Sequence, residues 1–197
     1  CEGIRGRVYV SPSPANSKLA ESAVPEWSPD QPMNQNCKDL VSGRGYGFKN
    51  WSDLFTSRQL VALSTFSDLV HEARAEIEKD ALAAELSDYP TPLRDDGKGA
   101  KAYAEAVSIF FAFGISKMTD YHSTITTWHH GREIIRNAFG RQALPMTWDY
   151  TEANPFSEST GNWGNCIAWG VKVLDRIQIA AMGSIIQHDA QSVNYPT

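Results

Sequence analysis

The sequence predicts a mainly α fold: a helical insertion domain with long antiparallel helices, an irregular N-terminal arm and a short C-terminal strand. Apolar residues recur at helical spacing over two long stretches, prolines crowd the first part of the chain, and a strand-like spacing appears near its end. We therefore divide the 197 residues into an irregular arm at 1–50, a helical domain at 51–150, and a segment at 151–197 whose turn, helix and strand lead into an α/β core.

The N-terminal arm carries five prolines between Ser11 and Asn36, among serine and asparagine. Proline has no backbone N–H and clashes with the preceding helical turn, so this density argues against helix interiors and central strands. Just before the proline-rich stretch, the alternation of side-chain types from Arg5 to Val10 is typical of one edge strand. The glycines at 43–47 lack the preceding strand and following Lys-Ser/Thr of a phosphate-binding loop, so we interpret them as a flexible turn.

The first long helix is predicted to begin at Thr56 and to reach about Leu86. Thr56 and Gln59 have the spacing of a capping box, in which each side chain satisfies a free backbone amide of the other residue. The expected outer face carries charges, and we interpret His71 among them as solvated. The apolar residues that define the inner face are Leu60, Leu63, Phe66, Val70, Ala73, Ile77 and Ala81, and the outer charges are Asp68, Glu72, Glu76 and Lys79.

A second helix is predicted over 100–119, after a break at 87–99 that contains two prolines and two glycines. A connection of this length most simply joins the two helices as an antiparallel pair. The aromatic side chains of the second helix favour core packing over a ligand pocket. Its apolar stripe consists of Tyr103, Val107, Phe110, Phe111, Gly114, Ile115 and Met118.

The stretch from Trp128 to Trp163 concentrates residues suited to chemistry or recognition. We predict a short helix over 131–139, closed by Gly140, with Pro145 preventing its continuation. A further helix is expected from Trp163 to Ala181, followed after Gly183 by a strand over 184–189. A helix, a glycine and a short strand that ends in an acidic residue are typical of the entry into an α/β nucleotide-type fold.

Composition excludes several classes of protein. A net charge of -5 and a pI near 5.5 argue against coating of nucleic acid through bulk positive charge, so any such contact must be local. Three widely spaced cysteines, without zinc-ligand spacing, favour reduced thiols in a cytoplasmic protein. No apolar run reaches the roughly 20 residues needed to cross a bilayer, which argues against a membrane. The ends of the chain, which starts without Met and stops just after a strand, lead us to expect a piece of a longer protein.

Three arginines are the leading candidates for binding. If the helix over 131–139 forms, Arg132 and Arg136 lie one turn apart on one face, with Arg141 just after the glycine. Guanidinium groups keep their charge and offer paired donors, so this set is suited to phosphates. Equally, the arginines could form ion pairs with neighbouring carboxylates, namely Glu133, Asp149 or Glu152, and only pin the loop.

Two other motifs invite a chemical interpretation, and we favour a structural one for both. Adjacent residues such as His129 and His130 point away from each other on a helix or a strand, so they do not readily chelate one metal ion. Asn154-Pro155-Phe156 is similar to the Asn/Asp-Pro-Pro-Tyr/Phe loop with which amino-methyltransferases hold the amine of a flipped base. It lacks the second proline and a preceding strand, so we predict an Asx-Pro turn before the Trp163 helix.

Two blocks of the chain carry a family resemblance: GFKNWSDLFTSRQLVALSTFSDLV, within 46–70, and GREIIRNAFGRQALPMTWDYTEANPFSESTGNW, at 131–163. Together with the final strand they resemble the central region of the large prokaryotic adenine-specific DNA methyltransferase-like proteins, which carry an N-terminal domain of unknown function. The likeness runs from about Arg5 to the end of the chain. It implies a helical insertion between the two halves of an S-adenosylmethionine-dependent methyltransferase core.

The resemblance places the cofactor loop upstream of this chain and the catalytic Asp-Pro-Pro-Tyr loop downstream of it. At most, Asp189 and Ala190, at the end of the predicted strand, would lie beside the cofactor's adenine. The implied partners are double-stranded DNA and the remainder of the methyltransferase core, and no tightly bound S-adenosylmethionine is expected on this fragment. The fragment would serve DNA recognition or scaffolding without activity of its own. The alternative is a non-catalytic helical module that docks a partner subunit.

Overall fold

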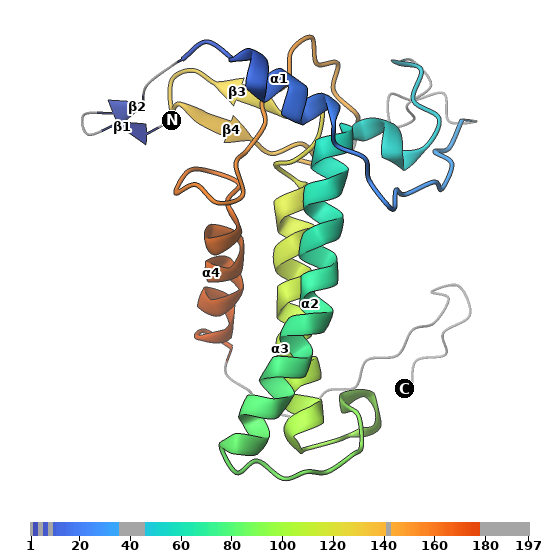
Figure 1. The fold of residues 1–197 in the computed structure, drawn as a ribbon, viewed down its shortest axis with the longest axis vertical. Helices are drawn as coiled ribbons and strands as arrows, with labels where there is room; N and C mark the ends of the chain where they lie inside the picture. The colour runs from blue at the N-terminus through green and yellow to red at the C-terminus, as the bar shows by residue number, and fades with distance from the viewer. Residues whose placement is uncertain (1, 4–5, 8–9, 36–45, 141–142, 178–197) are drawn as a thin grey trace, which may run out of the picture.

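Two long helices form the axis of the molecule and bear out the mainly α prediction. The computed structural model describes residues 2–3, 6–7, 10–35, 46–140 and 143–177. Helix α2 spans Ser57–Ala83 and helix α3 spans Ala100–Thr119, and the two run antiparallel along most of their length (Figure 1). The capping box predicted at Thr56 is present: Thr56 Oγ1 accepts from the Gln59 amide at 3.3 Å, and Gln59 Oε1 accepts from the Thr56 amide at 2.9 Å.

Small residues set the spacing of the helices. Where the end of α2 meets the start of α3, the buried positions are alanines, among them Ala81, Ala100 and Ala104. Helix α4, Trp163–Leu174, packs on the other side of α3, where Gly114 lies against Ile167 and Trp163. The predicted stripe on the second helix is wrong at Tyr103, which is 52% exposed, because the alanines take the inner positions there.

The N-terminal arm is less irregular than predicted. Helix α1 spans Pro14–Glu21, with Ser13 as its N-cap and Pro14 at its first position, where no backbone N–H is needed. The arm then runs antiparallel to the segment before α2, with Met33 N donating to Lys49 O at 2.7 Å and Trp51 N donating to Gln31 O at 3.1 Å. At the start of the arm, Glu2–Gly3 (β1) pairs antiparallel with Gly6–Arg7 (β2).

Irregular chain gathers around a hydrophobic cluster beside the N-terminal end of α2. The cluster consists of Met33, Leu54, Ile125, Ala138 and Leu144, with Tyr46, Phe48 and Phe55 packed against it. Leu54 belongs to a short 3₁₀ helix, η2, Trp51–Leu54, and a second one, η3, Leu93–Asp95, lies in the loop at the opposite end of the helical pair. The arm, the segment before α2 and the chain after α3 thus share one core.

The helix predicted over 131–139 is wrong. Residues Thr127–His129 (β3) and Ile134–Arg136 (β4) pair instead as an antiparallel hairpin, with Trp128 opposite Ile135. Ile134 and Ile135 are β-branched, and β-branched residues favour strands. Pairing with β3 also gives this segment backbone hydrogen bonds, whereas a short isolated helix is unstable. Glu133 closes the loop at a φ of 49°, in the left-handed region.

The C-terminal predictions are tested only in part. Helix α4 begins at Trp163 as predicted, with the Asn162 side chain accepting from the Asn165 amide at 2.7 Å, and it ends at Leu174 instead of Ala181. The predicted strand at 184–189, with Asp189 and Ala190, lies outside the described residues. None of the helices in the described ranges is long and apolar enough to cross a membrane.

Candidate nucleic-acid interface

The β3–β4 hairpin projects its loop away from the helical pair (Figure 1). Four residues, His130 to Glu133, connect its strands, and the Arg132 amide donates to His129 O at 3.2 Å. Both Arg132, in this loop, and Arg136, at the far end of β4, are exposed. The structure therefore brings the two arginines onto one hairpin, with the length of β4 between them, and the prediction that they share one helical face is wrong.

The hairpin is anchored to the end of α3. Asp120, the residue that caps α3, accepts a hydrogen bond from Ala138 N through its carbonyl at 2.7 Å and one from Phe139 N through its carboxylate at 2.7 Å. The Lys117 ammonium lies 3.3 Å from the same carboxylate. Hydrogen bonds to ionised groups are stronger than neutral ones, so Asp120 holds the chain that leaves β4 in a defined place.

A layer of buried polar residues joins the chain before the hairpin to the chain before α4. His122 is 2% exposed, and its Nε2 donates to Gly161 O at 2.9 Å. Burial lowers the pKa of His122, and this effect outweighs the opposing influence of the Gly161 carbonyl and the Glu152 carboxylate. Thr126 is fully buried and donates its hydroxyl proton to the Thr151 carbonyl, which ties the residue just before β3 to the chain that returns to α4.

One of the three carboxylates that could have paired with the candidate arginines does form an ion pair, but its partner is an arginine outside that set. Glu152 pairs with Arg58 of α2. In the part of the chain that the structure describes, no ion pair engages Arg132 or Arg136. These two guanidinium groups keep their donors available to solvent or to an anion. Arg141 lies outside the described residues.

The two adjacent histidines lie on β3 and in the loop that follows. His130 is exposed, whereas Nδ1 of His129 is buried and has no hydrogen-bond partner. Across the described residues, no cluster of three or more His, Cys, Asp or Glu side chains has a geometry that could hold a metal ion. Cys166 of α4 is a free buried thiol whose pKa is raised by burial.

Asn154, Pro155 and Phe156 form the predicted Asx turn. The Phe156 amide donates to the Asn154 side-chain oxygen at 2.9 Å, and the Trp163 amide donates to Pro155 O at 2.9 Å. The Phe156 ring lies 5.8 Å from the ring of Phe66 on α2, which in turn lies 5.1 Å from Trp163. The motif thus fixes the start of α4 against α2.

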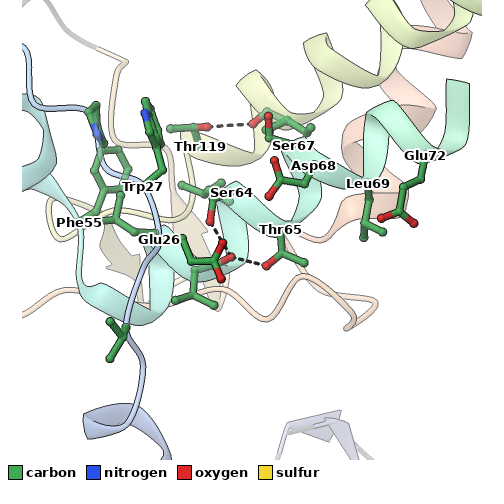
Figure 2. Close-up of a pocket in the computed structure, with 16 residues that line it drawn as sticks. Glu26, Trp27, Phe55, Ser64, Thr65, Ser67, Asp68, Leu69, Glu72 and Thr119 are labelled. Atoms are coloured by element: carbon green, nitrogen blue, oxygen red, sulfur yellow. Dashed lines mark hydrogen bonds between the residues drawn. The ribbon is translucent and has the colours of Figure 1, made fainter.

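A second candidate site lies in a groove of about 860 Å³ between the N-terminal arm, α2 and the end of α3 (Figure 2). Its carboxylates are Glu26 from the arm and Asp68 and Glu72 from α2, and Trp27 contributes an indole. The sequence predicted Asp68 and Glu72 on the charged outer face of the helix, where both are exposed, and it assigned no binding residue to the arm. Trp27, an aromatic residue in an otherwise polar, proline-rich segment, was the one signal for this groove.

In comparisons with known proteins, no family model matches the chain, and neither a curated protein nor a solved structure matches it.

Proposed function

We propose that this chain is the helical part of an S-adenosylmethionine-dependent DNA N6-adenine methyltransferase, in which the β3–β4 hairpin contacts DNA and the helices act as a scaffold. The observation that carries the proposal is the anchored hairpin with two exposed, unpaired arginines. Antiparallel two-stranded ribbons fit the major groove of B-DNA, and arginine is suited both to phosphates and to guanine edges. The protein as a whole is acidic, which confines this contact to a local surface.

The placement of the two resemblance blocks supports the methyltransferase assignment. The blocks are separated by about 60 residues of sequence, yet Arg58 pairs with Glu152, and Phe66 packs on both Phe156 and Trp163. The first block also reaches the chain before the hairpin, because Leu54 O accepts from Thr124 N at 2.8 Å. A shared folding unit is a physical reason for the two blocks to occur together in one family.

In the parent enzyme, S-adenosylmethionine would supply the methyl group for the amine of a flipped adenine. The cofactor-proximal positions that the resemblance implies, Asp189 and Ala190, lie outside the described residues, so no step of that transfer is assigned to the residues described here. The role proposed for this chain is to position DNA and to hold the remainder of the methyltransferase core.

Fluorescence anisotropy with a labelled DNA duplex over a salt series tests the DNA contact. We expect binding at low salt that weakens as salt rises, because each phosphate contact releases counterions. Replacing Arg132 and Arg136 together by alanine should remove most of this binding and flatten the salt dependence.

The matched control is the double variant Arg94→Ala with Lys98→Ala, which removes the same charge from the exposed loop at the other end of the helical pair. It should bind DNA as the wild type does. Equal losses in both double variants would mean that net charge, and not the hairpin, governs binding.

A non-catalytic module that docks a partner subunit is the second candidate. Helix α4 favours it, because Trp169 and Val173 lie one turn apart on it and are 63% and 53% exposed, and Ile177, just after its end, is 54% exposed. Absence of DNA binding even at low salt would favour this module over the DNA-contacting scaffold.

A further inference from the structure

All charged side chains that line the groove between the N-terminal arm and α2 are negative. It contains the carboxylates of Glu26, Asp68 and Glu72, and no lysine or arginine contributes to its lining. Asp68 and Glu72 are one helical turn apart, a spacing at which like charges repel. Within the described ranges, none of the three carboxylates belongs to an ion pair. A bound cation would relieve this repulsion.

Three of the hydroxyl groups that line the groove have already donated their protons to the helix backbone. Ser64 and Thr65 both donate their hydroxyl protons to Val61 O, at 3.2 and 2.7 Å, and Thr119 donates to Ile115 O at 2.9 Å (Figure 2). Each of these three oxygens is left with acceptor capacity only. Together with the carboxylates, these oxygens favour a ligand that is rich in N–H donors and poor in hydrogen-bond acceptors.

The apolar part of the lining extends along α2. Trp27 and Phe55 lie toward one end of the groove and Leu69 and Glu72 toward the other, with Glu26 between them (Figure 2). From Leu60 to Glu72 the helix rises about 18 Å, at 1.5 Å per residue. The Trp27 indole is 62% exposed, so its face is accessible to methylene groups or to an ammonium.

We propose that this groove binds a linear aliphatic polyamine, a chain of methylene groups interrupted by two or three ammonium groups. The methylenes lie along the apolar lining, and the ammonium groups donate to Glu26, Asp68 and Glu72. A peptide fits less well, because each of its residues brings a carbonyl acceptor for which the groove has few donors. A nucleotide phosphate is repelled by all three carboxylates.

Isothermal titration calorimetry with spermidine tests the proposal on the whole chain. Saturable binding of one spermidine per chain is expected, whereas hexane-1,6-diol, which keeps the aliphatic chain without the charges, should not bind. Magnesium chloride at the same ionic strength should not displace spermidine, because a small hydrated ion makes no use of the apolar lining. Failure to saturate, or displacement by magnesium at equal ionic strength, contradicts the proposal.

Variants locate the site. Asp68→Asn with Glu72→Gln should weaken spermidine binding by about tenfold or more, the equivalent of one lost charge-assisted contact of about 1.4 kcal/mol. The matched control, Glu78→Gln with Asp80→Asn, removes the same charge from α2 outside the groove and should leave the affinity unchanged. Trp27→Ala in the arm should weaken binding without changing the thermal stability of the helices. Equal weakening in the two charge variants would assign binding to the overall negative charge and overturn the site.

Discussion

The two ends of this molecule hold together by different means. At the hairpin end, residues 29–35, 46–56, 120–140 and 143–162 have little regular structure, yet they bury the hydrophobic cluster around Leu54 and the polar layer around His122. Below it, α2, α3 and α4 are regular, bury small residues such as Ala104 and Gly114, and expose large ones such as Phe113 and Trp169 (Figure 1). We refer to these regions as the head and the stem.

The two regions differ in where their long-range hydrogen bonds lie. The stem is built from local helical hydrogen bonds and close approach of small residues. The head depends on hydrogen bonds between distant segments, such as Thr124 N to Leu54 O and His122 Nε2 to Gly161 O. Removing one group from the head should therefore cost more than a similar change on the stem's surface.

The largest expected effect is on the cluster of the head. Leu54 is fully buried, so Leu54→Ala should lower the free energy of unfolding by about 2–5 kcal/mol through lost burial and a residual cavity. Leu69 on the stem is 45% exposed, and Leu69→Ala should cost less than about 1 kcal/mol. Urea denaturation monitored by circular dichroism measures both. Similar losses in the two variants would remove the distinction between head and stem.

The next effect concerns the packing of α4 in the stem. A Cβ atom at Gly114 would meet the Ile167 side chain, so Gly114→Leu should destabilise the protein by about 1–3 kcal/mol through overpacking. Near Gly170, by contrast, a Cβ would meet nothing within 4 Å. Gly170→Ala should therefore stabilise α4 by about 0.5–1 kcal/mol through helix propensity. Thermal unfolding, with tryptophan fluorescence as a local probe, separates the two outcomes.

A smaller effect is a pH dependence that originates in the head. Burial lowers the pKa of His122 below its ordinary value of 6.5, so below that pH the unfolded chain binds a proton that the folded protein does not. His122 therefore contributes stability above pH 6.5, and this contribution is lost as the pH falls toward the folded-state pKa. Unfolding free energies at pH 7.5 and 5.5 should differ less in His122→Gln than in the wild type. In His71→Gln, which alters an exposed histidine of the stem, the wild-type difference should persist.

The smallest effect is expected at the ion pair that joins stem to head. Arg58 and Glu152 are partly exposed, with side chains 47% and 22% accessible, so solvent screens their attraction. Arg58→Ala should cost about 0.5–1 kcal/mol, and a double-mutant cycle with Glu152→Ala gives the coupling itself. A coupling well above this range would indicate that the pair is a main link between the two regions.

The stem was largely predictable from the sequence, whereas the head was not. The capping box that opens α2, the bounds of α3 and the start of α4 at Trp163 all follow from residues within a few positions of one another. The Asx turn at Asn154 is a part of the head that follows in the same local way. The hairpin was predicted as a helix, because Gly131 to Gly140 carries helix-ending signals at a plausible spacing. The pairing of β4 with β3, and the hydrogen bonds from the amides of Ala138 and Phe139 to Asp120, override that local preference.

The candidate sites divide in the same way. Charge and residue type by themselves identified Arg132 and Arg136 as cations suited to phosphates, because a guanidinium stays charged in any fold, and left open whether neighbouring carboxylates pair with them. Their arrangement on a hairpin, and the pairing of Glu152 with Arg58, were decided by tertiary structure. The groove was decided by tertiary structure alone, because Glu26 and Glu72 come from segments that no local rule brings together. Helices form through contacts that the chain makes with its near neighbours, whereas a site made of distant segments exists only once those segments pack.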